Sequence, residues 1–237
     1  MERAREFTTS GRSRLLQALP EAARSGIEAA SERVSLGLKA ILYEPNAPIT
    51  HVYFPLSGVM SLVIEMQDGE VVEVATVGNE GFVGSPVFLG TDRSPTKAFA
   101  QVPGEVLKVA VEDFKRELQE QPALHELIRR YTQALMNQIS QSTACNHLHS
   151  IQERMCRWLL MTHDRVGADQ FSLTQEFLSQ MLGVRRASVT VVAGILQQAR
   201  LIEYQRGRIK VLNRAGLEEG ACECYRVVRD EYDRLLG

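Results

Sequence analysis

The sequence predicts an α+β protein with an antiparallel β-roll at the N-terminus, then a long helix, then a basic helical unit. Three observations support this fold class. Between Leu38 and Val111, short β-branched runs alternate with turn signals such as Asp68-Gly69 and Pro103-Gly104. After Val111 the apolar residues follow helical spacing. Residues 151–214 hold 10 Lys and Arg against 5 Asp and Glu, although the formal net charge of the whole chain is -2.

The length of 237 residues allows two domains joined by the long helix. We expect a β-roll with an N-terminal helix in residues 1–117, the long helix in 118–149, and the basic helical unit in 150–237. The hydrophobic fraction of 44% and the charged fraction of 24% are those of a soluble globular protein. No signal peptide and no apolar run of membrane-spanning length is present, which predicts a cytoplasmic protein without a membrane partner.

The β-roll is predicted to be jelly-roll-like, with strands in HVYF, SGVMSLVIEM, GEVVEVATV and GEVLKVAV. Before it, residues Ser13 to Glu32 form a helical pattern that Pro20 breaks. Asp68-Gly69 is the sharpest hairpin signal, and it predicts a tight primed turn that needs positive φ.

The long helix carries a stripe that repeats at spacings of 4 and 3, as in a coiled coil. It runs into Cys145 and consists of Leu124, Ile128, Tyr131, Leu135, Gln138 and Ser142. We expect this stripe to be the seam of a homodimer. The alternative is that the same face packs on the strand domain of its own chain.

Two short amphipathic patterns then flank a Gly-Val-Arg-Arg turn. The first would bury Phe177, Leu178, Met181 and Leu182, and the second Val189, Val192, Ala193 and Leu196. Gly183 can end the first helix in the left-handed conformation, which gives helix-turn-helix geometry. Residues 201–212 then predict a two-stranded hairpin with a basic tip, hence a C-terminal winged helix-turn-helix. The expected contacts with double-stranded DNA are Thr174, which also caps the first helix, Arg185, Arg186, Ala187, Ser188, Thr190, Val191, Arg206 and Arg208.

At this point the chain resembles the Crp/Fnr superfamily of bacterial transcription regulators over most of its length. LYEPNAPITHVYFPLSGVMSLV is similar to a cyclic-nucleotide-binding-like roll, with Tyr53 and Gly58 at the family's aromatic and turn positions. The predicted helix-turn-helix is similar to that of the family at Gly183, Arg186, Val189, Leu196 and Leu201-Ile202. The resemblance implies a homodimer that reads a two-fold DNA site and holds a small-molecule effector in the roll. RNA polymerase is a further candidate partner.

The effector remains unidentified, because the roll departs from the family's cyclic-nucleotide pattern. Where the resemblance implies a Gly-Glu pair and an Arg-Ser pair, the chain has Gly84-Ser85 and Arg93-Ser94. Ser85 lacks the carboxylate, and a charged acceptor makes a hydrogen bond roughly twice as strong. These four residues are the candidate effector pocket, and a cyclic nucleotide is not expected. The first cysteine is Cys145, so the N-terminal cysteine cluster of the oxygen-sensing branch is missing and no iron-sulfur cluster is expected.

The expected recognition helix also departs from the family pattern. Arg186 can bond guanine bidentately, whereas the other two positions that commonly contact bases hold Ala187 and Val191, which could touch thymine methyl groups.

Cysteine and histidine residues near the end of the long helix do not predict a metal site. Cys145 and His149 would share a helix face that excludes His147, so a three-ligand site would require the helix to end there. We expect a hinge or dimer-interface cluster there, and packed or exposed thiols at Cys222 and Cys224. No phosphate loop, GxSxG elbow or HExxH helix indicates an enzyme. The alternative function is a sensing β-roll protein that acts through protein contacts.

Overall fold

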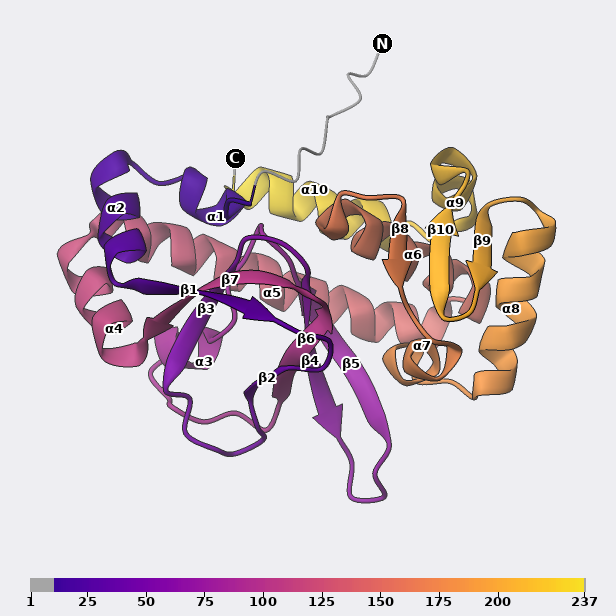
Figure 1. The fold of residues 1–237 in the computed structure, drawn as a ribbon, viewed down its shortest axis with the longest axis horizontal. Helices are drawn as coiled ribbons and strands as arrows, with labels where there is room; N and C mark the ends of the chain where they lie inside the picture. The colour runs from indigo at the N-terminus through magenta and orange to yellow at the C-terminus, as the bar shows by residue number, and fades with distance from the viewer. Residues whose placement is uncertain (1–10, 237) are drawn as a thin grey trace, which may run out of the picture.

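The computed structural model describes residues 11–236 and shows a β-roll on one side, a smaller helical unit on the other, and a long helix behind both (Figure 1). The predicted antiparallel roll is confirmed. One sheet has the order β2-β6-β4-β5, and its strands are β2 (Ile41–Tyr43), β6 (Lys97–Val102), β4 (Val59–Glu65) and β5 (Val71–Val77). The other has the order β1-β7-β3, with β1 (Ser31–Leu36), β7 (Gly104–Ala110) and β3 (His51–Pro55). Within the described residues, no helix is both long and apolar enough to cross a membrane.

Local turn and cap signals are placed as the sequence predicts, with one difference. Pro20 separates α1 (Arg14–Gln17) from α2 (Glu21–Ala29). The β4–β5 hairpin forms at Asp68-Gly69, but only Gly69 in its loop has positive φ, at 84°. The backbone N–H of Met66 donates to Glu70 O, 2.8 Å away. The turn is therefore a longer loop, and the predicted primed two-residue turn is wrong.

The long helix α5 (Pro122–Leu148) follows α3 (Ser85–Phe88) and α4 (Val111–Glu120). Its apolar face packs against other parts of the same chain. The ring of Tyr131 lies 5.2 Å from that of Phe82, which also contacts Phe54 and Phe114. The ring of Tyr131 also lies 6.2 Å from that of Tyr232 in the C-terminal helix α10 (Cys224–Leu236), which runs antiparallel along α5.

The structure corrects the predicted dimer seam. All of its positions are buried within one chain, namely Leu124, Ile128, Tyr131, Leu135, Gln138 and Ser142. The Gln138 amide donates to Thr76 O of the roll, 3.1 Å away, and Arg157 donates to Ser142 Oγ. Helical spacing shows which face is buried but not what covers it. The alternative prediction, that this face packs on the strand domain of its own chain, is correct in part. The roll covers some of the buried stripe, and α10 covers the remainder.

The C-terminal unit consists of α6 (Ile151–Val166), β8 (Gln170–Ser172), α7 (Gln175–Leu182), α8 (Arg186–Gln198), β9 (Ile202–Gln205), β10 (Arg208–Val211), α9 (Arg214–Gly220) and α10. It is docked on the roll through a buried ion pair, in which Arg165 Nε lies 2.8 Å from Glu80 Oε1 and both side chains are at most 10% exposed. The Arg165 guanidinium also donates to Thr76 and Gln138. One arginine of α6 therefore contacts the roll and α5 together.

A second buried acid, Glu73 of β5, lies between the roll and α6. Trp158 Nε1 donates to Glu73 Oε1 at 2.8 Å, and Ser61 Oγ donates to Glu73 Oε2 at 2.6 Å. The residue as a whole is half-buried, and both of its carboxylate oxygens accept these hydrogen bonds. Burial raises the pKa of Glu73 to about 7, against the opposing effect of both hydrogen bonds.

This raised pKa predicts a pH-dependent stability. Between about pH 4.5 and pH 7 the folded chain holds the Glu73 proton more tightly than the unfolded chain, so the free energy of unfolding falls as pH rises. Glu73→Gln should match the parent near pH 4.5 and exceed it by up to about 3 kcal/mol above pH 7. Urea unfolding across this pH range measures the difference. The exposed Glu65→Gln is the control, and a Glu73→Gln difference that does not change with pH would contradict the pKa.

Candidate nucleic-acid interface

The helix-turn-helix forms where the sequence predicts it. Thr174 caps α7 by accepting from the Phe177 backbone N–H, at 3.1 Å, and the apolar faces of both helices are buried. Gly183 ends α7 in the left-handed conformation, with φ 60° and ψ 42°. The turn is Gly183–Arg185, because α8 begins at Arg186 with Arg185 as its N-cap residue.

The outward face of α8 is largely exposed to solvent. Arg185, Arg186, Ala187, Thr190 and Val191 are exposed, and Ser188 is half-buried. Val191 is 63% exposed and so presents an apolar side chain on this face. The expected DNA-facing residues therefore share one accessible surface, on a helix at the outer edge of the molecule (Figure 1).

The wing is a hairpin of β9 and β10 that turns at Arg206-Gly207. Both residues have positive φ, 50° and 73°, which is the two-residue primed turn that matches the strand twist. Arg206 and Arg208 are exposed at its tip. The sequence analysis missed β8, which pairs with β10 as a third strand, because three residues around Phe171 are too few for a strand pattern.

Direct contacts join these elements into one surface. Thr190 Oγ1 donates to Gln175 Oε1 at 2.8 Å, which connects α8 to the first residue of α7. The backbone N–H of Leu173 donates to Gly207 O at 2.7 Å, which brings the wing turn to the same place. Gln175 is an interface residue that the sequence analysis did not identify, since a polar residue at a helix start carries no distinguishing signal.

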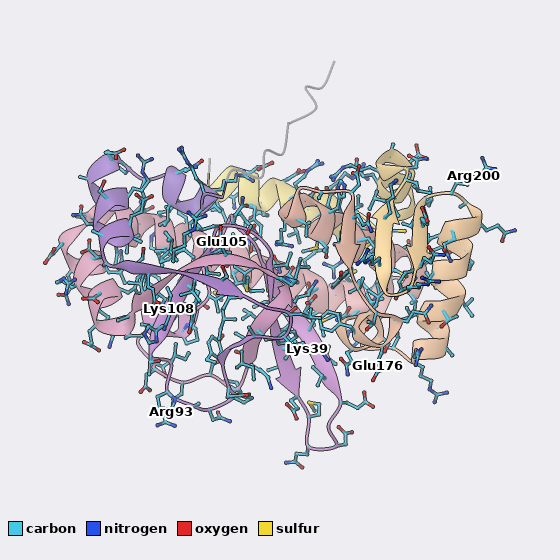
Figure 2. The ribbon with its side chains drawn as sticks, in the orientation of Figure 1. Lys39, Arg93, Glu105, Lys108, Glu176 and Arg200 are labelled. Atoms are coloured by element: carbon cyan, nitrogen blue, oxygen red, sulfur yellow. The ribbon has the colours of Figure 1, made fainter. Side chains whose placement is uncertain are left out.

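The charge of this surface is not neutralised internally. Among residues 11–236, no ion pair involves Arg185, Arg186, Arg200, Arg206 or Arg208. Figure 2 shows Arg200 extending into solvent at the outer end of α8, with Glu176 at the opposite end of the helix pair. Five free guanidinium groups around one exposed helix suit a polyanion.

The four residues expected to bind the effector do not together form a pocket. Gly84 is buried against Val52, whereas Arg93 is 58% exposed and donates to Asn46 O at 2.7 Å. Figure 2 shows Arg93 directed away from the roll. Ser94 is buried, and its hydroxyl is hydrogen-bonded to that of Thr96. Ser85 starts the short helix α3.

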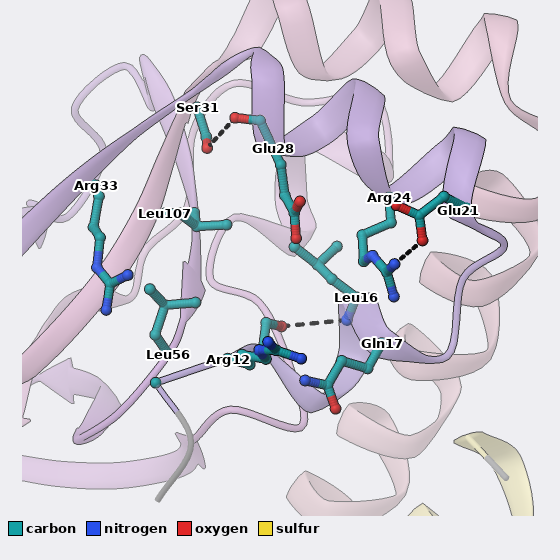
Figure 3. A pocket seen from close by; sticks show the side chains of 12 residues that line it. Arg12, Leu16, Gln17, Glu21, Arg24, Glu28, Ser31, Arg33, Leu56 and Leu107 are labelled. Atoms are coloured by element: carbon teal, nitrogen blue, oxygen red, sulfur yellow. Dashed lines mark hydrogen bonds and ion pairs between the residues drawn. The ribbon is translucent and has the colours of Figure 1, made fainter.

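A polar pocket of about 540 Å³ lies elsewhere, between the N-terminal helices and β1 (Figure 3). Charged side chains line it from several elements, among them Arg12, Glu21, Arg24, Glu28 and Arg33. Gly84, Ser85, Arg93 and Ser94 do not line it. Their role in effector binding stays a prediction.

The fold and this surface define a winged helix-turn-helix DNA-binding protein with an attached β-roll. Residues 33–121 match the family model of the cyclic nucleotide-binding domain, and residues 153–219 match that of the Crp-like helix-turn-helix domain. The chain belongs to the Crp/Fnr superfamily and is a sequence-specific DNA-binding transcription regulator of that type.

Several known proteins are similar over most of the chain. The global nitrogen regulator of Synechococcus elongatus is 23% identical over 188 residues, which are 75% of this chain and 84% of that protein. The global nitrogen regulator of a Nostoc species is 24% identical over 180 residues, or 72% and 80%. Among solved structures, a Crp/Fnr-family regulator from Eubacterium rectale has a TM-score of 0.67 at 16% identity, covering 90% of this chain and 98% of that one. The c-di-GMP-responsive global regulator of Xanthomonas campestris also has a TM-score of 0.67, at 17% identity over 81% and 99%. These structures confirm the fold.

Proposed function

We propose that the chain regulates transcription as a homodimer whose two α8 helices enter successive major grooves, about 34 Å apart. The observation that carries this proposal is the continuous exposed surface of α8, the start of α7 and the basic wing. Because α7 is docked on the roll through the T-shaped contact of Phe177 with Phe99, it holds α8 with its outward face accessible. The match to a Crp-like helix-turn-helix favours this function over a roll that acts only through protein contacts.

The exposed side chains suggest distinct roles in DNA recognition. Arg186 near the start of α8 would bond guanine O6 and N7, and Val191 would contact a thymine methyl group. Arg206 and Arg208 of the wing would contact phosphates. The Thr190 hydroxyl already donates to Gln175, so it offers DNA only an acceptor.

The homodimer requires a surface other than the buried stripe of α5. Exposed residues of α5 repeat at spacings of 3 and 4 through Gln133, Met136, Ser140 and Thr143. Met136 is 55% exposed at the middle of this outward stripe. We assign the two-fold contact to it, since a 3-4 repeat along a helix of 27 residues can pack against its own copy.

We also propose that the roll binds an effector that is neither cyclic AMP nor cyclic GMP. Support comes from Ser85, which lacks a carboxylate, and from Arg93, whose guanidinium is directed to the Asn46 carbonyl at the surface. A ligand that reorders this edge of the roll would reach α6 through the Glu80–Arg165 pair.

Selection from random duplexes with the purified full-length chain tests the function. The expected result is a two-fold motif with half-sites centred about 10 base pairs apart and an affinity that falls steeply with salt. Selection that returns no shared motif would contradict sequence-specific reading.

Arg186→Ala should weaken binding to the selected site by about 1–3 kcal/mol and relax the preference at one base pair. Anisotropy titrations on the site and on its single-base variants measure both effects. Arg226→Ala, which removes an exposed arginine of α10, is the control and should leave both unchanged. Equal losses on specific and random DNA would make Arg186 a phosphate contact instead.

Met136→Glu should weaken the dimer by at least about tenfold, because a two-fold contact places each new carboxylate near its counterpart. Sedimentation velocity over a range of concentrations measures the dissociation. Met66→Glu changes a methionine of nearly equal exposure, 56%, in the β4–β5 loop and should leave the dimer intact. An unaffected Met136→Glu dimer would place the interface elsewhere.

Cyclic AMP and cyclic GMP should leave the Tm of the chain unchanged. A ligand bound at a hundredfold excess over its Kd adds about 2.7 kcal/mol to stability, which thermal unfolding detects readily. A clear rise in Tm with either nucleotide would contradict the proposed ligand class.

A further inference from the structure

Four potential metal ligands from distant parts of the chain meet where α5 ends. Cys145 lies in the last turn of α5 and His149 directly after that helix, while Cys222 precedes α10 by two residues and Cys224 is its first residue. Their ligand atoms all lie within 4.8 Å of one another. The three cysteines form a small buried cluster apart from the main core, and the His149 side chain is 17% exposed. The sequence analysis, which treated the two pairs separately, expected no such site.

Two distances in this cluster are close to those expected around a tetrahedral ion. With Zn–S bonds of about 2.3 Å and a Zn–N bond of about 2.0 Å, tetrahedral angles separate two sulfurs by about 3.8 Å and a sulfur from a nitrogen by about 3.5 Å. Cys145 Sγ lies 3.5 Å from Cys222 Sγ, and Cys224 Sγ lies 3.5 Å from His149 Nδ1. All four cysteines are free, and a disulfide would need its sulfurs at about 2.05 Å.

The surrounding groups are those that support a metal site. His149 Nε2 lies 3.2 Å from Glu223 Oε2, so the ring can hold Nδ1 toward the sulfurs while it donates from Nε2 to a carboxylate. Gln141 Nε2 donates to Cys224 Sγ at 3.1 Å, which favours a thiolate there. A histidine oriented by a carboxylate and a thiolate that accepts a hydrogen bond are regular outer partners of zinc ligands.

Charge also fits an anionic metal centre. Arg154 and Arg157 of α6 are buried, and both are close enough to act electrostatically on Cys145. Their Nε atoms have no hydrogen-bond partner, and neither arginine forms an ion pair within the described chain. A buried cation needs a counter-charge, and Arg157 acts electrostatically on Glu73. One Zn²⁺ with three thiolates and a neutral imidazole has a net charge of -1, which would offset one further positive charge.

We propose that Cys145, His149, Cys222 and Cys224 bind one structural Zn²⁺ ion. Binding would release three thiol protons to solvent, because thiolates are the ligands. Four protein ligands leave no open position, as in structural rather than catalytic zinc sites. An iron-sulfur cluster has several iron and sulfide atoms to accommodate, and ligand atoms this close leave space for a single ion. The ion would hold the start of α10 against the link between α5 and α6.

Metal analysis of the full-length chain tests this proposal without DNA. Chain purified from zinc-supplemented culture under reducing conditions should hold about one zinc per chain. Cys222→Ser and His149→Ala should lower this by at least about tenfold. The matched controls are Cys156→Ser, a buried cysteine outside the cluster, and His147→Ala, whose Nδ1 lies by Thr143 O; both should keep the metal. Equal zinc in ligand and control variants would overturn the assignment.

Cobalt substitution gives a second readout on the unchanged chain, so it does not depend on whether the variants fold. The chain stripped of metal and kept reduced should bind one Co²⁺ and develop the visible bands of tetrahedral cobalt with thiolate charge transfer. Zinc should displace that cobalt. An absent spectrum, an octahedral cobalt spectrum, or a Cys145–Cys222 disulfide in metal-free chain purified under reducing conditions would overturn the proposal. These outcomes are independent of DNA binding.

Discussion

Burial of one face of α5 is the constraint on which the remaining structure depends. Tyr131 is fully buried, and its ring contacts both Phe82 of the roll and Tyr232 of α10. Each large side chain buried in this way stabilises the fold by about 1.5–3 kcal/mol, more than the helix gains from its own backbone. The roll, α5 and α10 therefore form one core, and α10 has to run back along α5 to complete it.

The same core fixes the orientation of the DNA-binding unit. α6 starts next to the end of α5 and returns across the roll, where Arg165 meets Glu80 and Trp158 meets Glu73. Removing either partner of the Arg165–Glu80 pair would leave a buried charge unpaired, at a cost of about 3–5 kcal/mol. As a result α7 faces the roll and α8 faces solvent. A change in the roll can reach the DNA-facing surface by moving α6 against these contacts, or directly through the contact of Phe99 with Phe177 of α7.

Sequence alone predicted the parts of the fold that single residues determine locally. Gly183 ends α7, Thr174 caps it, and Gly207 permits the wing turn. The position of the helix-turn-helix could therefore be predicted from the amino-acid sequence. The local sequence does not determine which part of the protein covers an apolar helix face. The predicted seam of α5 was assigned to a second chain because its spacing fits packing between two chains as well as packing within one chain. Contact between Cys145 and Cys222 spans 77 positions, which no pattern within either segment reveals.

The position of the cysteine cluster gives α10 two attachments of different strength. At its C-terminal end, Tyr232 and Val228 are held by apolar burial worth a few kcal/mol together. At its N-terminal end, Cys222 and Cys224 lie beside His149. His149 directly precedes Ser150, whose capping box starts α6. The free energy of binding structural Zn²⁺ is about 10 kcal/mol or more in zinc-finger peptides. With zinc bound, metal coordination would set the geometry of the α5–α6 link together with the side chains around it. That link is the covalent connection between the roll's long helix and the DNA-binding unit.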